Sequence, residues 1–189
     1  KSEILTPSEF ETLQLTLYKE SLKLSSANIA SEWDAIPSNI KKNIDVIMIY
    51  VEALEAEGNH KGAVAVIKKG LKRNWDDRLV NFYGRIAGDD SKKQLLIAES
   101  WLRERPSNST ILLTLGRLSL QNESWDKARQ YFEDSIKLEK SAEAYAELAR
   151  LLSHLGEYEK SNEYYQASIA YTGASLPDLP LPERAQTFN

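Results

Sequence analysis

Hydrophobic residues recur along most of the chain every three or four positions, the spacing that places them on one face of an α-helix. Near the start this spacing begins after Pro7 and continues to Leu24, and a second short helix is predicted from Ser26 to Ile36. Eight longer helices follow as four consecutive pairs: Ser38–Glu57 with His60–Arg73, Asp76–Gly88 with Ser91–Arg105, Asn108–Asn122 with Ser124–Lys140, and Ala142–Leu155 with Glu157–Tyr171. The pattern therefore predicts an all-α protein.

The predicted pairs repeat at a nearly constant interval. A bulky residue followed by a smaller one recurs in the first helix of each pair: Tyr50-Val51, Tyr83-Gly84, Leu115-Gly116 and Leu148-Ala149. In three of the second helices a small residue is followed four positions later by a bulky one: Ala63 and Ile67, Ala128 and Phe132, Ser161 and Tyr165. Small residues let paired helices approach closely, and large residues fill the gap to the next pair. This combination, at this interval, is typical of the tetratricopeptide repeat.

The predicted organisation has three parts. Residues 1–37 form an N-terminal helical cap or a degenerate repeat, and residues 172–189 form a Pro-rich tail. Between them lie four repeats, at about 38–74, 76–105, 108–140 and 142–171. Three prolines within residues 177–182 cannot lie inside a helix, so the tail is predicted to be extended. The predicted fold class is an all-α, right-handed tetratricopeptide-repeat solenoid of helix-turn-helix pairs.

Composition and charge remove several classes of function. The chain has 28 acidic and 24 basic residues, a formal charge of −4, and no cysteine. The acidic balance argues against a nucleic-acid partner, because phosphate neutralisation requires a basic face. The lack of cysteine excludes disulfides, thiolate metal sites and a cysteine nucleophile. The longest apolar run, residues 46–51, is far shorter than the roughly 20 residues that cross a bilayer.

The sequence offers no arrangement typical of an enzyme, a metal site or a bound cofactor. His60 and His154 lie in or beside predicted turns without a second ligand at a suitable spacing, and Met48 is expected to fill the core or the groove. The acidic pairs Asp76-Asp77 and Asp89-Asp90 precede predicted helices, where carboxylates stabilise the positive end of the helix dipole. The four tryptophans are expected to pack between helices. We therefore predict that the protein is not an enzyme and holds no metal or cofactor.

One set of polar residues falls at equivalent positions of the repeats. In tetratricopeptide units the first helix of each pair lines the concave face, and the residue after the small one points into the groove. These residues are Glu52, Arg85, Arg117 and Arg150, and Asn81 and Glu147 face nearly the same way. Arginine binds carboxylates bidentately, which predicts a groove for an acidic ligand: a peptide carboxylate, an acidic partner helix or porphyrin propionates. The alternative is that each arginine pairs with a glutamate of the neighbouring helix and holds the units together.

Two runs are unusual for a generic repeat, Trp75-Asp76-Asp77-Arg78-Leu79-Val80 and Glu143-Ala144-Tyr145-Ala146-Glu147-Leu148-Ala149. Further matching runs lie at 83–84, 98–102, 112–118, 125–131 and 176–182. Over roughly residues 30–182 the chain thereby resembles the C-terminal repeat domain of the proteobacterial HemY family, inner-membrane proteins associated with late haem biosynthesis. The departures are Ser135 and Ser161, where alanine is commoner.

The resemblance carries expectations about location and partners. Because the chain begins at Lys1 rather than Met, we expect it to be a piece of a longer protein. The resemblance implies that this protein is anchored in the bacterial inner membrane through an upstream segment, with the cytoplasmic face favoured. It also implies a non-enzymatic scaffold in late protohaem biosynthesis, whose partners are enzymes of that pathway. The arginines leave open a second interpretation, a carrier that binds a porphyrin or haem intermediate.

Overall fold

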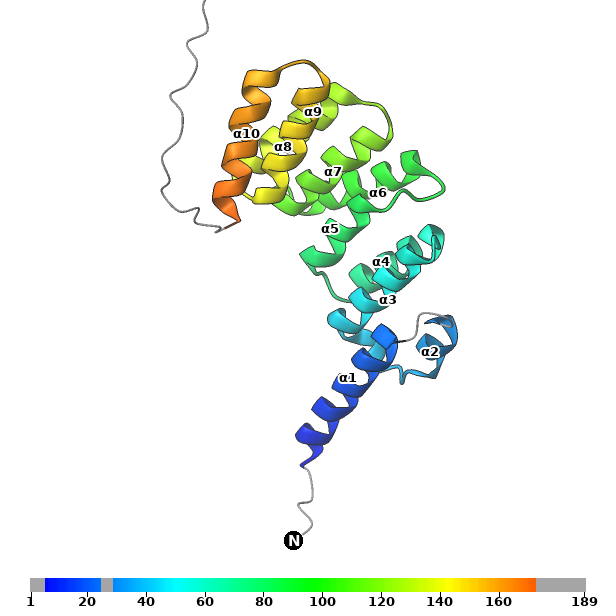
Figure 1. Ribbon diagram of the computed structural model, residues 1–189. Helices are drawn as coiled ribbons and strands as arrows, with labels where there is room; N and C mark the ends of the chain where they lie inside the picture. The colour runs from blue at the N-terminus through cyan, green and yellow to red at the C-terminus, as the bar shows by residue number, and fades with distance from the viewer. Residues whose placement is uncertain (1–5, 25–28, 173–189) are drawn as a thin grey trace, which may run out of the picture. The chain divides into compact units, whose positions relative to one another are not determined.

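The computed structural model describes residues 6–24 and 29–172, and all regular structure within those ranges is helical (Figure 1). The chain divides into two compact units, residues 1–139 and residues 140–189. The first unit contains α1 (Pro7–Leu24), α2 (Ile29–Ala35), the 3₁₀ helix η1 (Ile40–Lys42), α3 (Ile44–Ala56), α4 (His60–Arg73), α5 (Asp77–Arg85), α6 (Ser91–Glu104), α7 (Ser109–Gln121) and α8 (Trp125–Leu138). The second unit contains α9 (Ala142–His154) and α10 (Tyr158–Tyr171). The predicted Pro-rich tail lies outside the described residues from position 173 onwards.

The predicted all-α class is confirmed, and a helix is found in each of the eight segments predicted to form the pairs. The first helices of the pairs, α3, α5, α7 and α9, begin at the evenly spaced positions Ile44, Asp77, Ser109 and Ala142. The second helices, α4, α6, α8 and α10, begin less evenly, and α6 starts early at Ser91, as the sequence predicts. The predicted bounds of α4 are those observed. Both Gly58 (φ +74°) and Gly156 (φ +81°) adopt the left-handed conformation expected at helix ends.

The prediction of one continuous helix over Ser38–Glu57 is wrong. Residues Ile40–Lys42 form a 3₁₀ turn, and Asn43 is extended, with φ −71° and ψ 127°. The Asn43 side-chain oxygen accepts hydrogen bonds from the backbone N–H groups of Asp45 (3.0 Å) and Val46 (3.3 Å). An asparagine that caps a helix in this way competes with continuation of the preceding turn, and α3 therefore begins at Ile44.

The small residues of the repeat permit the close approach that the sequence predicts. In the first unit α7 packs against both α5 and α8. A Cβ atom at Gly84 would lie 2.9 Å from the Thr114 Cα atom of α7, and one at Gly116 would lie 2.3 Å from the Phe132 ring of α8. Any larger side chain at these positions would push the helices apart. Around these contacts lies a core of fully buried side chains, including Val46, Val51, Ile67, Leu79, Leu115, Leu118 and Phe132.

Two bulky residues that were predicted to pack between helices do not do so. Tyr165 is 41% exposed on α10, and Trp125 is 45% exposed at the start of α8. Trp33, by contrast, stacks on Tyr50 with ring centroids 4.1 Å apart, and Trp75 meets Trp101 edge to face at 5.7 Å. Three of the four tryptophans therefore pack as predicted.

Serine takes a specific role where alanine is commoner in the repeat. Within α9 and α10, the Ser161 hydroxyl donates to the Ala149 carbonyl oxygen at 2.8 Å, and the Ser168 hydroxyl donates to the Ala142 carbonyl oxygen at 2.8 Å. In the first unit, Ser135 of α8 makes the bond equivalent to that of Ser168, to the carbonyl oxygen of Ser109 at 2.8 Å. These buried or half-buried hydroxyls tie the second helix of a pair to the first.

The second pair departs from the repeat in one respect that shapes the surface. Helix α5 has nine residues, whereas α3, α7 and α9 have 13 each. Its end leaves backbone groups without helical partners, and the buried Gln94 of α6 takes them: Nε2 donates to the carbonyl oxygens of Tyr83 (2.7 Å) and Ile86 (3.0 Å), and Oε1 accepts from Gly88 N–H at 3.2 Å. Gln94 of α6 thus takes the position that Ala63 has in α4 and Ala128 has in α8.

Candidate functional site

The predicted groove residues of the first unit lie on three helices. Glu52 of α3 is exposed and forms no ion pair with any described residue. Arg85, at the end of α5, is also exposed, and its guanidinium carbon lies 5.4 Å from the centroid of the Phe82 ring. A cation over an aromatic face is weakly held, so the Arg85 guanidinium remains accessible to a ligand.

Arg117 of α7 differs from Arg85, because its side chain is buried. It is 8% exposed, and its Nη1 donates a hydrogen bond to the Asn81 Oδ1 atom of α5 at 2.8 Å. The bond joins the first helices of two neighbouring pairs. The Arg117–Asn81 bond therefore agrees with the alternative in which arginine holds the units together.

Arg150 lies in the second unit, on α9. Its side chain is 58% exposed and forms an ion pair with Glu147, one turn earlier on the same helix. The Arg150 guanidinium thus stays solvated in this pair, whereas the Glu147 side chain is half-buried, with 17% of it exposed. Of the three arginines at equivalent positions, Arg85 and Arg150 are available on the surfaces of their own units and Arg117 is not.

The two histidines and the methionine form no site. His60 is half-buried, and its Nδ1 atom is hydrogen-bonded to the Ala87 carbonyl oxygen at 3.0 Å. His154 is exposed at the end of α9, and Met48 is half-buried on α3. Among the described residues no group of three or more His, Cys, Asp or Glu side chains could hold a metal ion.

The paired carboxylates act at helix starts, as predicted. Asp76 accepts from the Arg78 N–H at 2.9 Å, and Asp90 accepts from the Lys93 N–H at 2.9 Å. Hydrogen bonds from Arg78 hold the pKa of Asp76 below its usual range.

Within the part of the chain that the structure describes, no helix has both the length and the apolar character to span a bilayer.

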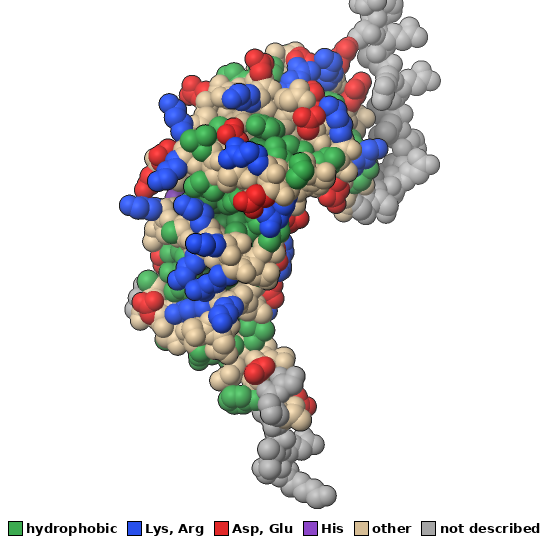
Figure 2. Space-filling view, turned by 180° about the vertical axis from the view of Figure 1, so that it is seen from behind, with side chains coloured by type: hydrophobic (Ala, Val, Ile, Leu, Met, Phe, Trp, Pro, Cys, Tyr) green, Lys and Arg blue, Asp and Glu red, His purple; other side chains and the backbone are tan. Residues whose placement is uncertain are grey.

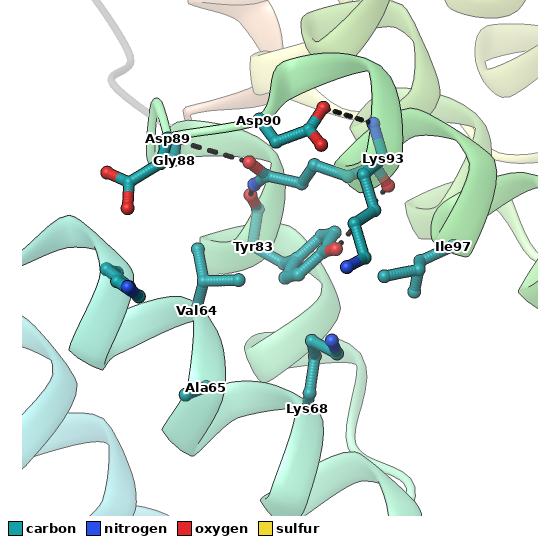
Figure 3. Close-up of a pocket in the computed structure, with 11 residues that line it drawn as sticks. Val64, Ala65, Lys68, Tyr83, Gly88, Asp89, Asp90, Lys93 and Ile97 are labelled. Carbon is teal, nitrogen blue, oxygen red and sulfur yellow. Dashed lines mark hydrogen bonds between the residues drawn. The ribbon is translucent and has the colours of Figure 1, made fainter.

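A cleft that the sequence analysis did not predict lies between α4 and α6. It consists of two hollows, of about 240 and 400 Å³, which share Lys68 and Ile97. In Figure 3 Val64, Ala65 and Lys68 extend from one helix, Lys93 and Ile97 extend from the other, and the Tyr83 ring lies at the base between them. The second hollow ends on Trp75 and Trp101. The first hollow is therefore lined mainly by apolar groups, and the second combines apolar side chains with polar and charged ones.

The base of the cleft is rigidly held. Tyr83 is fully buried, its hydroxyl donates to the Gln94 carbonyl oxygen at 3.4 Å, and its ring lies 4.7 Å from that of Trp101. Burial raises the pKa of the Tyr83 hydroxyl far above its usual range. At the other end the Arg105 guanidinium covers the Trp75 ring at 3.8 Å. Gln94 thus ties α6, one wall of the cleft, to the end of the short α5.

The rim of the cleft carries lysines that form no ion pair with a described residue. They are Lys61, Lys68 and Lys72 of α4 and Lys93 of α6. Figure 2 shows Lys and Arg side chains gathered over this part of residues 1–139. A signal was present in the sequence, since Lys61, Lys68 and Lys72 are spaced seven and four apart and so share one helix face. It was missed because the prediction considered only the first helix of each pair.

The comparisons with known proteins support the repeat and the fold. Residues 142–173 match the family model described as tetratricopeptide repeat. No curated protein matches the chain. Three solved structures that resemble it are PilF of Pseudomonas aeruginosa (20% identity, TM-score 0.56, 89% of this chain and 78% of that one), a MamA protein (13%, 0.54, 89% and 100%), and MamA of Desulfovibrio magneticus RS-1 (14%, 0.52, 86% and 97%). At these identities the likeness concerns the fold alone, and the chain has the fold of a tetratricopeptide-repeat protein.

Proposed function

We propose that this domain is a non-enzymatic scaffold that binds partner proteins on the first helices of its repeats. The observation that carries the proposal is the series of helix pairs built around small residues, with cations exposed at the equivalent positions Arg85 and Arg150. Repeats of this kind bury their core against their neighbours and leave a surface of regularly spaced side chains. Such a surface suits a peptide or helix better than it suits a reaction centre.

The chemistry of the exposed residues favours an acidic segment of the partner. Arg85 has no carboxylate partner among the described residues, and the exposed Arg150 guanidinium pairs with Glu147 of its own helix. A partner carboxylate could replace either contact with a bidentate one. Arg117 and Asn81 support the first unit's part of this surface from beneath, because their hydrogen bond sets the spacing of α5 and α7.

The resemblance to the HemY family supplies the finer part of the proposal. It implies a longer protein anchored in the bacterial inner membrane, with this domain on the cytoplasmic side and late haem-biosynthesis enzymes as its partners. The support for this part is the resemblance of the quoted sequence runs, above all residues 75–80 and 143–149.

Affinity capture from a detergent-solubilised membrane extract tests the proposal. The baits are the wild-type domain, the double variant Arg85→Ala/Arg150→Ala, and a matched variant Lys127→Ala/Lys140→Ala, which removes two exposed lysines from elsewhere on the chain. We expect haem-biosynthesis enzymes to be retained by the wild type and the lysine variant and to be lost from the arginine variant. Capture by all three baits would leave the scaffold standing and refute the role of the arginines. Capture of no protein by any bait would refute the scaffold.

A porphyrin carrier is the second candidate, and the exposed arginines are the feature that favours it, because they could bind propionates. It is distinguished by titration with protoporphyrin at micromolar concentration. A carrier would shift the porphyrin absorption band and quench tryptophan fluorescence, and the arginine double variant would weaken both changes. An unchanged spectrum would refute the carrier without affecting the scaffold.

A further inference from the structure

The cleft between α4 and α6 lies apart from the proposed partner face, since both of its walls are second helices of their pairs. Three features of the cleft bear on what it binds: its charge, its apolar floor and its length. Each feature constrains the ligand independently.

The charge of the rim is not balanced within the described part of the chain. Lys68 and Lys72 are one turn apart on α4, and like charges at this spacing destabilise a helix. Asp89, Asp90 and Glu104 also line the cleft, but Glu104 pairs with Arg105 at 3.0 Å, so the four lysines outnumber the two remaining carboxylates. A local excess of positive charge in a chain whose formal charge is −4 is complementary to an anionic ligand.

The apolar part of the cleft indicates that the ligand carries apolar groups as well as negative charge. Val64, Ala65 and Ile97 line the first hollow, and Trp101 lines the second beside the buried Leu71. Except for Leu71 these groups are partly solvated, and their burial would add a hydrophobic contribution to binding. A ligand that satisfies both features carries aliphatic side chains between carboxylates.

The cleft has the length of a short peptide. Lys61 and Lys72 are eleven positions apart on one helix, which corresponds to about 16 Å at about 1.5 Å per residue. An extended chain rises about 3.3 Å per residue, so about five residues span this distance. A flat membrane surface would reach the lysines and miss the recessed floor, and a nucleic acid would meet the exposed Asp89 at one end.

We infer that the α4–α6 cleft is a second docking site, which binds an extended acidic segment of a partner protein with leucine-type side chains between its carboxylates. The aliphatic side chains lie on the floor formed by Val64 and Ile97, and the carboxylates pair with Lys61, Lys68 and Lys72. The site does not include Arg85 or Arg150, so it can be tested separately from the proposed partner face on the first helices.

The probe is a fluorescein-labelled eight-residue peptide of alternating Glu and Leu, followed by fluorescence anisotropy with the whole 189-residue chain. We expect saturable binding that weakens as salt increases, because screening reduces the attraction between exposed charges. A peptide of alternating Glu and Ser should bind about tenfold more weakly, since it lacks the apolar contact. A peptide of alternating Lys and Leu should not bind. Equal binding of all three peptides, or no binding of the first, would overturn the inference.

Two triple variants locate the site. Lys61→Glu/Lys68→Glu/Lys72→Glu reverses the rim, and Lys69→Glu/Arg73→Glu/Lys92→Glu reverses three exposed cations of α4 and α6 that do not line the cleft. We expect the rim variant to lose at least about tenfold more affinity than the matched variant, because paired charges act at short range. Equal losses would mean that the peptide senses only the net charge, and would overturn the inference.

Lysine acetylation of the wild-type chain gives a readout that does not require any variant to fold. Bound peptide should protect Lys61, Lys68 and Lys72 and leave the exposed Lys127 and Lys140 reactive. Anionic lipid vesicles and a duplex DNA oligonucleotide serve as competitors. Displacement of the peptide by either one, with the same lysines protected, would assign the face to a membrane or a nucleic acid and would refute the peptide site.

Discussion

Arg117 Nη1 donates a 2.8 Å hydrogen bond to Asn81 Oδ1 and so joins the first helices of two successive repeats. We expect Arg117→Ala to lower the free energy of unfolding by about 1.5–3 kcal/mol, since it removes a nearly buried, charge-assisted bond. Arg85→Ala, which removes an exposed side chain of the same type, should change it by less than about 0.5 kcal/mol. Urea denaturation followed by circular dichroism measures both. Equal effects of the two substitutions would contradict the structural role of Arg117.

The contact between Gly116 and the Phe132 ring predicts a steric effect that a second substitution relieves. A Cβ at Gly116 would lie 2.3 Å from the ring, so Gly116→Ala should cost about 1–3 kcal/mol of stability. The double variant Gly116→Ala/Phe132→Leu should lose less than the sum of the two single variants, because the smaller side chain makes room. Thermal and urea unfolding of the four proteins gives the coupling energy. Additive losses would show that the two residues do not interact in this way.

Gln94 satisfies backbone groups that the early end of α5 leaves without partners. Gln94→Ala should lower stability by about 1–3 kcal/mol, since the Tyr83 carbonyl oxygen loses its 2.7 Å hydrogen bond and the Ile86 carbonyl oxygen keeps only the 3.4 Å one from Gln121. Gln130→Ala is the matched control, because Gln130 is exposed and bonds only to a surface carboxylate, that of Asp134, in the described structure. Hydrogen exchange should report faster opening around residues 86–94 in the Gln94 variant. Unchanged exchange there would contradict the role assigned to Gln94.

The hydrogen bonds of the Asp45 carboxylate predict how the stability of the protein depends on pH. Its carboxylate accepts from Lys19 Nζ at 2.7 Å and from Arg78 Nη1 at 2.9 Å, and these bonds hold its pKa below the ordinary value of 3.8. A carboxyl whose pKa is lowered by folding stabilises the protein above its ordinary pKa, and that contribution disappears as the pH falls through the lowered value. Asp45→Asn should therefore be less stable than the wild type at pH 7, with a difference that narrows below about pH 4.

The measurement for Asp45 is the urea midpoint at pH 7, 5, 4 and 3. Asp34→Asn serves as the control, because Asp34 is exposed and its carboxylate makes no ion pair with a described residue. A stability difference between Asp45→Asn and the wild type that stays constant over this range would show that the bonds to Lys19 and Arg78 do not depend on the charge of Asp45.

The helices, their pairing and most of their ends could be predicted from the amino-acid sequence. Helical periodicity, left-handed glycines and capping side chains act between residues that are close along the chain, so Gly58, Asp76 and Asp90 could be assigned without a structure. The 3₁₀ turn before Asn43 was missed, because a capping asparagine and a helical asparagine look alike in a hydrophobic pattern.

The accessibility of the equivalent arginines and the position of the cleft follow from tertiary packing. Arg85 and Arg117 hold the same place in the repeat, yet Arg85 is exposed whereas Arg117 is buried and donates a hydrogen bond to Asn81 of the preceding pair. The cleft likewise lies between the second helices of two successive pairs, and Gln94 ties one of them, α6, to the end of the short α5. Whether a side chain is exposed or lines a cleft depends on contacts between segments that are far apart in the sequence. The periodic pattern of the repeats therefore could not predict how the second pair, α5 and α6, departs from the others.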